Sequence, residues 1–193
     1  TSPTLAGELS HPPLKGFTDY LGPLSRFRFT EANPEFDFCL VLSGPEPQRT
    51  IFEKKALSTI PGHAKGTIIR GLPGTSTTPE VKENIRIYNH LPSDEFQNYL
   101  LKSRTVICRS GYSSVMDLVT LKKPAVFVPT PGQTEQEYLA RHLEGDSFSR
   151  MTQKEFSLKN ALDTGQHLVR PDYSPAGDLA QKITESLHKL DIR

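Results

Sequence analysis

Short apolar runs alternate with amphipathic segments along most of this chain. The apolar runs are rich in β-branched and aromatic residues, as buried strands are, and they cover 36–42, 66–70, 85–89, 105–108, 125–128 and, more weakly, 148–152. The segments between them have apolar residues at helical spacing and predict helices over about 47–60, 94–102, 112–121, 133–143, 154–163 and 175–190. Strands that alternate with helices predict an α/β fold, a doubly wound, Rossmann-like parallel sheet with helices on both faces.

Two segments follow neither pattern. Residues 1–35 are rich in Pro, Gly, Ser and Leu and have weak periodicity, so we expect an extended entry segment and not a separate domain. Residues 73–84 are polar and predict a loop. With 193 residues, the chain has room for one large α/β domain or two small ones.

The turn after the fourth apolar run carries the most specific chemistry. It reads Arg109-Ser110-Gly111, and Ser113 and Ser114 can cap the helix that begins there. Such a turn aims backbone N–H groups, the positive end of the helix dipole and the cation of Arg109 at one point. We therefore predict an anion site, most naturally for phosphate.

The predicted sheet brings a second loop to this turn. Ligands of doubly wound sheets bind beyond the carboxyl ends of the strands, where the strand order reverses, and in the common order this point lies between strands one and four. The loop after strand one, 43–49, is therefore expected to face 109–111 across one crevice. Asp117, on the exposed face of the following helix, can accept hydrogen bonds from a ribose diol, and the backbone at Leu91 can lie beside a base. These neighbours extend the prediction from a phosphate site to a nucleotide site.

A polar cluster follows strand five. Its amide, hydroxyl and carboxylate groups suit sugar hydroxyls, which both donate and accept, and they belong to Thr130, Gln133, Gln136 and Glu137. Plainer interpretations stay open for several candidates. They are a solvated helix face for Gln136 and Glu137, a structural carboxylate partner for Arg109, simple capping for Ser113 and Ser114, and a surface position for Arg49.

The composition limits the classes of function. Twenty-three basic and 22 acidic residues give a net charge of +1, which provides no general field for nucleic acid, so no nucleic-acid partner is expected. No apolar run approaches the length of a transmembrane span, and no signal pattern is visible. Cys39 and Cys108 lie in apolar runs and are expected to be buried free thiols in a reducing compartment. Neither has partners at metal-ligand spacing, so no metal is expected.

The combination of these motifs resembles a known family. The run Arg109-Ser-Gly-x-x-x-x-x-Asp117, the apolar strand ending in Pro129, and Gln136-Glu137 are similar to the donor-binding half of GT-B glycosyltransferases. The likeness is to the MurG-like N-acetylglucosaminyltransferases and related UDP-sugar transferases, and it covers about residues 20–190. Residues 22–27 also resemble the interdomain segment of such enzymes.

The resemblance implies transfer of a sugar from a nucleotide diphosphate sugar, a UDP-sugar such as UDP-GlcNAc, to an acceptor hydroxyl. It implies a diphosphate held by Ser43, Gly44, Arg49, Arg109, Ser110, Gly111, Ser113 and Ser114, uracil at the backbone of Leu91, ribose at Asp117, and the donor sugar at Gln136 and Glu137. No cofactor or metal is implied, because Arg109 and helix N-termini can stabilise the leaving diphosphate. Two departures bear on ligand identity: the relatives usually have Glu in place of Asp117 and often Gln in place of Glu137.

The resemblance also implies a domain organisation. Residues 1–20 are expected to be an interdomain connecting segment and 21–193 the donor domain, while the N-terminal half that holds the acceptor and the catalytic base is expected to be missing. The implied location is the cytoplasm, with peripheral association at the inner face of a membrane. The alternatives are a GT-B-fold UDP-sugar epimerase or hydrolase, and a non-catalytic nucleotide-binding module.

Overall fold

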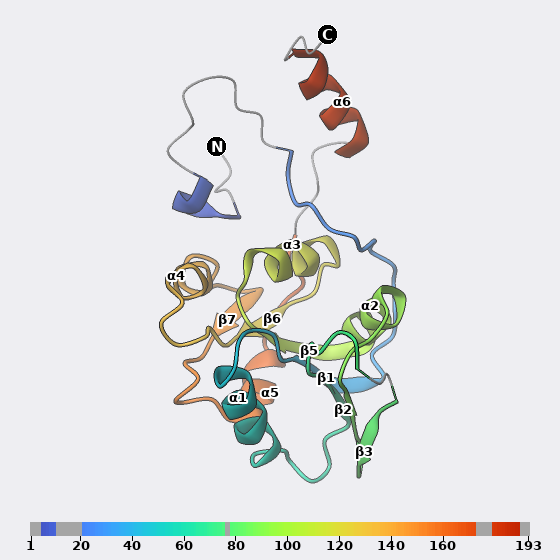
Figure 1. Cartoon of the computed structure of the whole chain (residues 1–193), viewed down its shortest axis with the longest axis vertical. Helices are drawn as coiled ribbons and strands as arrows, with labels where there is room; N and C mark the ends of the chain where they lie inside the picture. The colour runs from blue at the N-terminus through green and yellow to red at the C-terminus, as the bar shows by residue number, and fades with distance from the viewer. Residues whose placement is uncertain (1–4, 11–20, 76–77, 173–178, 190–193) are drawn as a thin grey trace.

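The computed structural model describes residues 5–10, 21–75, 78–172 and 179–189. Within these residues, seven strands form one sheet in the order β3-β4-β2-β1-β5-β6-β7 (Figure 1). All neighbouring strands are parallel except β3 and β4. The strands are β1 (Phe36–Val41), β2 (Gly66–Ile69), β3 (Glu80–Lys82), β4 (Ile85–Tyr88), β5 (Ser103–Cys108), β6 (Ala125–Phe127) and β7 (Phe148–Arg150).

Helices cover both faces of the sheet, as predicted. One apolar core lies beneath α2 (Ser93–Lys102), α3 (Tyr112–Thr120) and α4 (Thr134–His142). The other lies beneath α1 (Gln48–Leu57) and α5 (Leu158–Gly165). Successive strand side chains point to opposite faces, so Cys39 belongs to the first core and its neighbours Phe38 and Leu40 to the second.

The strand order reverses between β1 and β5, which confirms the predicted switch point. Without the antiparallel β3, the order is that of the Rossmann fold. Leu40 is paired with Ile107 and Val41 with Cys108, so the two strands end level. The loops that follow them therefore leave the same edge of the sheet side by side.

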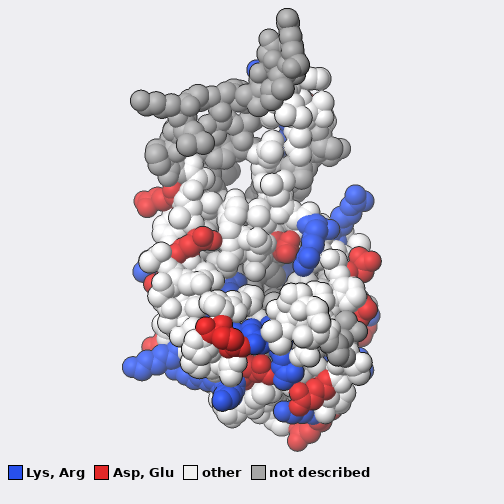
Figure 2. Space-filling model, in the orientation of Figure 1, with Lys and Arg blue, Asp and Glu red and all other residues white. Residues whose placement is uncertain are grey.

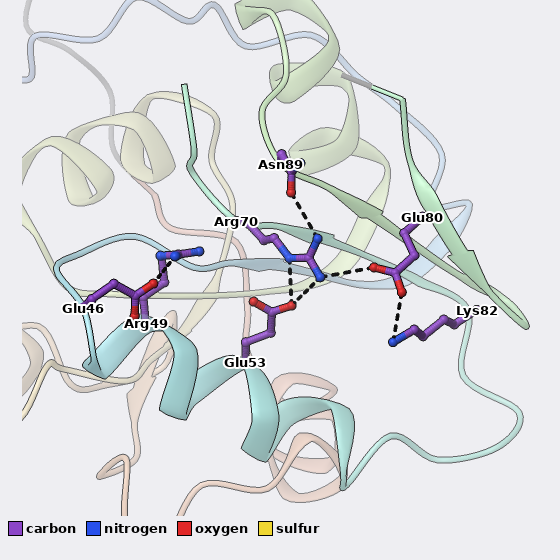
Figure 3. Close-up of polar contacts among 7 residues, drawn as sticks. All are labelled: Glu46, Arg49, Glu53, Arg70, Glu80, Lys82 and Asn89. Atoms are coloured by element: carbon purple, nitrogen blue, oxygen red, sulfur yellow. Dashed lines mark hydrogen bonds and ion pairs between the residues drawn. The ribbon is translucent and has the colours of Figure 1, made fainter. Parts of the chain in front are cut away.

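Strand β3 was not predicted, because the polar residues 73–84 predict a loop. All three of its side chains are exposed, so the sequence has no apolar alternation there. Arg70, just after β2, links this edge to its neighbours (Figure 3). Its guanidinium donates to Glu53 at 2.8 Å, to Asn89 at 3.0 Å and to Glu80 at 3.2 Å. This network makes Arg70 a structural residue of the β2 turn.

Helix bounds differ from the prediction near the C-terminus. Helix α5 begins at Leu158 instead of 154, because Ser157 caps it by accepting a hydrogen bond from the Asn160 N–H at 3.1 Å. The last helix, α6 (Leu179–Lys189), is drawn apart from the sheet in Figure 1, and its Ile183 and Leu187 are exposed. The predicted start of this helix at 175 lies outside the described residues.

The expected extended segment before β1 is only partly extended. Residues 21–35 contain no helix or strand, but Gly7–Ser10 form a short 3-10 helix, η1. This helix lies against α4, where the N–H of Glu8 donates to the Tyr138 hydroxyl at 2.7 Å. Residues 1–4 and 11–20 of the segment lie outside the described part of the chain.

The two cysteines are buried free thiols, as predicted. Burial raises the pKa of Cys39 far above its ordinary value and raises that of Cys108 to about 12. Both thiols therefore stay protonated at neutral pH and act as small apolar side chains.

Acidic and basic side chains are intermingled over the face of the molecule shown in Figure 2. This distribution agrees with the net charge of +1. Among the described helices, none is long and apolar enough to cross a membrane.

The first residue of β2 offers a test of the packing. A Cβ on Gly66 would lie 2.3 Å from the ring of Phe38, which is fully buried. Gly66→Ala is therefore expected to lower the free energy of unfolding by about 1–3 kcal/mol, measured by urea denaturation. Gly62→Ala is the matched control, because a Cβ there meets nothing within 4 Å. Equal stability of the two variants would contradict this account of the packing.

Candidate functional site

The N-terminus of α3 opens onto free space at the switch point. Gly111 is the N-cap, with φ −70° and ψ 147°, and no side chain caps the helix. A Cβ on Gly111 would meet nothing within 4 Å. A cavity of about 360 Å³ borders this helix start and is lined by Tyr112, Glu135 and three residues around η1. The first N–H groups of the helix and the positive end of its dipole therefore face an open region.

The predicted capping by Ser113 and Ser114 is wrong. The helix begins one residue before them, at Tyr112, so both serines lie inside its first turn. Ser113 is exposed and Ser114 is half-buried. Their hydroxyls remain beside the open helix start, without the capping role that the sequence suggested.

Arg109 does not direct its cation into this open region. Its side chain is 1% exposed and lies against the ring of Phe52, 4.4 Å from the ring centre. The guanidinium donates to the carbonyl oxygens of Val128 at 2.8 Å, Pro129 at 3.1 Å and Gln48 at 3.3 Å. The sequence prediction of an outward-pointing cation is therefore wrong, because backbone acceptors from two neighbouring loops surround the side chain. A structural carboxylate partner, the other interpretation, is not present among the described residues either.

Gln153 completes the surroundings of Arg109, and sequence reasoning missed it. Its Oε1 accepts from Arg109 at 2.7 Å, and its Nε2 donates to Gln48 Oε1 at 2.8 Å. Lys55 of α1 donates to the Gln153 carbonyl at 3.0 Å. Burial lowers the pKa of Arg109 to about 10, so the group is still cationic at neutral pH. Arg109 thus joins the start of α1, the end of β6 and the loop after β7 around one buried charge.

The loop after β6 is braced by the side chains that were predicted to hold the donor sugar. Gln136 Oε1 accepts from the Thr130 N–H at 2.8 Å, and Glu137 Oε1 accepts from the Gly132 N–H at 3.0 Å. Ser110, which is fully buried, donates its hydroxyl to the Gln136 carbonyl at 2.7 Å. The three residues therefore fix the loop to the turn of α3, and their assignment to ligand contacts stays a prediction.

The loop after β1 meets this braced loop at Gly44. Gly44 has φ +108°, a region that glycine adopts readily, and a Cβ added there would lie 3.6 Å from the Thr130 hydroxyl. That hydroxyl is buried and has no hydrogen-bond partner among the described residues. Ser43 is half-buried beside Gly44. The sequence predicted the turn 109–111 as the neighbour of loop 43–49, and the adjacent, level ends of β1 and β5 place these two loops side by side.

Arg49 is turned toward its own loop. Its guanidinium pairs with Glu46 (Figure 3), and its side chain is mostly buried. Hydrogen bonds from Thr50 and the charge of Arg49 hold the pKa of Glu46 below its ordinary value. The structure thus gives Arg49 a loop-stabilising ion pair, and its diphosphate role stays a prediction.

Asp117 and Leu91 are the candidates for the nucleoside. Asp117 lies on α3, half-buried instead of exposed, and accepts a hydrogen bond from the Ser25 hydroxyl at 2.6 Å. Burial raises the pKa of this carboxyl above its ordinary value. The Leu91 side chain is buried in the core next to α2, and only its backbone remains for a base.

Comparisons with known proteins show the family to which this chain belongs. Residues 72–188 match the glycosyltransferase family 28 C-terminal domain. An uncharacterized glycosyltransferase of Methanosarcina acetivorans is 29% identical, over 72% of this chain and 38% of its own length. The Haemophilus ducreyi UDP-N-acetylglucosamine--N-acetylmuramyl-(pentapeptide) pyrophosphoryl-undecaprenol N-acetylglucosamine transferase is 27% identical, over 97% of this chain and 52% of its own length. The chain thus spans about half or less of the length of these relatives.

Solved structures agree on the fold. The glycotransferase of kitacinnamycin has a TM-score of 0.54 at 15% identity and is matched over 89% of this chain and 44% of its own. Acinetobacter baumannii MurG has a TM-score of 0.52 at 14% identity, over 82% of this chain and 51% of its own. The matched family region begins at residue 72, after the end of β2, extends into α6, and includes the turn of α3, Asp117 and the braced loop. The chain therefore belongs to glycosyltransferase family 28, as a C-terminal domain of that family.

Proposed function

We propose that this chain binds a nucleotide diphosphate sugar and is the donor-binding part of a glycosyltransferase. The observation that carries the proposal is the uncapped N-terminus of α3, which opens onto free space at the switch point of the sheet. Anions bind at such helix starts, and doubly wound sheets bind ligands at such switch points. A UDP-sugar, with UDP-GlcNAc first, is the donor we propose, because the Haemophilus ducreyi relative bears that donor in its name.

In this proposal the diphosphate lies before Gly111, where the first N–H groups of α3 receive it. Negative charge grows on the leaving diphosphate during transfer, and the helix dipole stabilises it without a metal ion. The remaining carboxylate oxygen of Asp117 accepts from the ribose, and the backbone at Leu91 meets the base. Arg109 holds the loops that surround the diphosphate and does not contact it.

We further propose that the acceptor and the catalytic base come from a second domain. The matched region is 38% and 52% of the length of the two relatives, which leaves room for such a domain in them. The Haemophilus ducreyi relative is named for a lipid-linked acceptor, so we propose a cytoplasmic enzyme that meets its acceptor at the inner membrane face. On this account the chain alone binds donor but does not transfer it.

Calorimetric titration of the chain with UDP, UDP-GlcNAc, UDP-glucose, GDP and ADP tests the proposal. We expect the uridine nucleotides to bind at least about tenfold more tightly than GDP or ADP, a difference of about 1.4 kcal/mol. Equal binding of all five would favour a non-catalytic nucleotide-binding module, and no binding would overturn the proposal. Release of free sugar, or a change of the sugar, in UDP-GlcNAc without acceptor would favour the hydrolase or the epimerase instead.

A further inference from the structure

We propose that Ser25, which precedes the sheet in the sequence, is a positioning residue of the ribose site. Its hydroxyl fixes the carboxylate of Asp117 so that one oxygen is bound within the protein and the other is offered to the ligand. The inference rests on the proposed function, because it assigns a role within the same nucleotide site. It adds to that site the segment around Ser25, which lies outside the strands and helices of the sheet.

The hydrogen bonds of Ser25 fix the direction of its hydroxyl. Ser25 Oγ donates to Asp117 Oδ1 at 2.6 Å, and it accepts from the backbone N–H of Phe27 at 3.0 Å. A hydroxyl has one proton to donate, so that proton is committed to Asp117. No donor among the described residues is bonded to Asp117 Oδ2. A carboxylate accepts at both oxygens, so Oδ2 keeps its full capacity for a ribose hydroxyl.

The segment that carries Ser25 is anchored on both sides. We call Leu24–Arg28 the strap. Its Leu24 N–H contacts the sulfur of Met116 on α3 at 3.2 Å, next to Asp117. Its Arg28 N–H donates to Gln97 of α2 at 3.2 Å. The strap therefore spans from α3, which carries Asp117, to α2, which follows Leu91. Asp117 and Leu91 are the two proposed nucleoside contacts.

Phe27 is the main anchor of the strap. It is 4% exposed and packs edge-on against Phe96 of α2, with ring centres 5.7 Å apart. The Arg26 guanidinium lies 4.9 Å from the centre of the Phe27 ring. Because the residue with this buried ring also supplies the backbone N–H that orients Ser25, the position of the hydroxyl is set by the core and not by a free loop.

The charges around Asp117 agree with this role. Burial raises its pKa, while the Ser25 hydrogen bond and the nearby Arg26 lower it. Burial raises the pKa of Cys108 on β5 and the charge of Asp117 contributes to this rise, so that thiol stays neutral. Loss of the Ser25 hydroxyl removes the hydrogen bond that holds the ionised carboxylate in one orientation, so it should both raise the Asp117 pKa and loosen the side chain.

The test compares Ser25→Ala with Ser25→Thr in calorimetric titrations against UDP and 2′,3′-dideoxy-UDP. Ser25→Ala should weaken the affinity for UDP by about five- to tenfold, as expected for the loss of one hydrogen bond. It should change the affinity for 2′,3′-dideoxy-UDP by less than about twofold. Ser25→Thr keeps a hydroxyl and should bind both ligands like the unchanged chain. Ser58→Ala, which removes a hydroxyl at the far end of α1, is the matched control.

Each outcome decides one question. Unchanged UDP affinity in Ser25→Ala, or an equal loss for both ligands, overturns the inference while the proposed function stands. Failure of the unchanged chain to bind UDP overturns the proposed function and this inference with it. NMR titration of the Asp117 carboxyl gives a ligand-free readout. A pKa that is higher in Ser25→Ala than in Ser25→Thr supports the contact, and equal values exclude it.

Discussion

Arg109→Ala is expected to lower the free energy of unfolding by about 3–4 kcal/mol, among the largest effects of any single substitution in this chain. The change leaves the carbonyls of Val128 and Gln48 and the amide of Gln153 without their donor in a buried region. It also removes the contact with the Phe52 ring and opens a cavity. Chemical denaturation followed by circular dichroism measures the effect.

Two other substitutions serve as controls for this experiment. Arg109→Lys keeps the charge, but one ammonium cannot span acceptors on three segments, so an intermediate loss is expected. Arg170→Ala removes an arginine of similar size that is exposed and pairs with Glu31, and it should cost less than about 1 kcal/mol. If Arg109→Ala were as mild as Arg170→Ala, the joining role of Arg109 would be refuted. Because Arg109→Ala should unfold the site, its loss of ligand binding would not by itself show a contact with the ligand.

Gly111→Val is expected to weaken binding of UDP and UDP-GlcNAc by roughly hundredfold or more, about 2.7 kcal/mol, while the fold survives. The backbone of Gly111 is extended, which valine adopts easily, and a Cβ there meets no protein atom within 4 Å. The added methyl groups would instead occupy the space in front of α3, where the diphosphate is proposed to lie. Calorimetry measures the affinity, and denaturation should show a stability change of about 1 kcal/mol or less.

Gly145→Val is the matched control for this blocking experiment. A Cβ at Gly145 also meets nothing within 4 Å, and this glycine lies in the turn before β7. It should leave nucleotide binding unchanged. Nucleotide affinity that is retained in Gly111→Val would mean that the ligand does not lie at the start of α3.

The sheet and its switch point could be predicted from the sequence because they depend on local patterns. The runs that became β1 and β5 are strongly apolar, and the turns after them are well marked, so the strand order and the facing loops followed from general rules of parallel sheets. β3 could not be predicted, because its pairing with β4 leaves all its side chains exposed. Register with a neighbour, not burial, makes it a strand.

The orientation of the site residues depends on partners far along the chain. Arg109 turns inward because of Gln153, 44 positions later, and because of backbone carbonyls, which leave no trace in a sequence. Asp117 is half-buried and accepts a hydrogen bond from Ser25, 92 positions earlier. Residue types at the crevice could therefore be predicted, whereas the division between groups that face a ligand and groups that hold the loops required the structure.

The bracing of the loop after β6 has a consequence for engineering donor selectivity. Gln136 and Glu137 are the obvious positions to randomise, but both side chains hold backbone N–H groups of their own loop. In a combinatorial library at these two positions, many variants would therefore lose the hydrogen bonds that hold the loop. Their loss of binding could not be distinguished from a changed sugar preference. Ser113 and Tyr112 are exposed at the open helix start. Libraries placed there would sample selectivity on an intact scaffold.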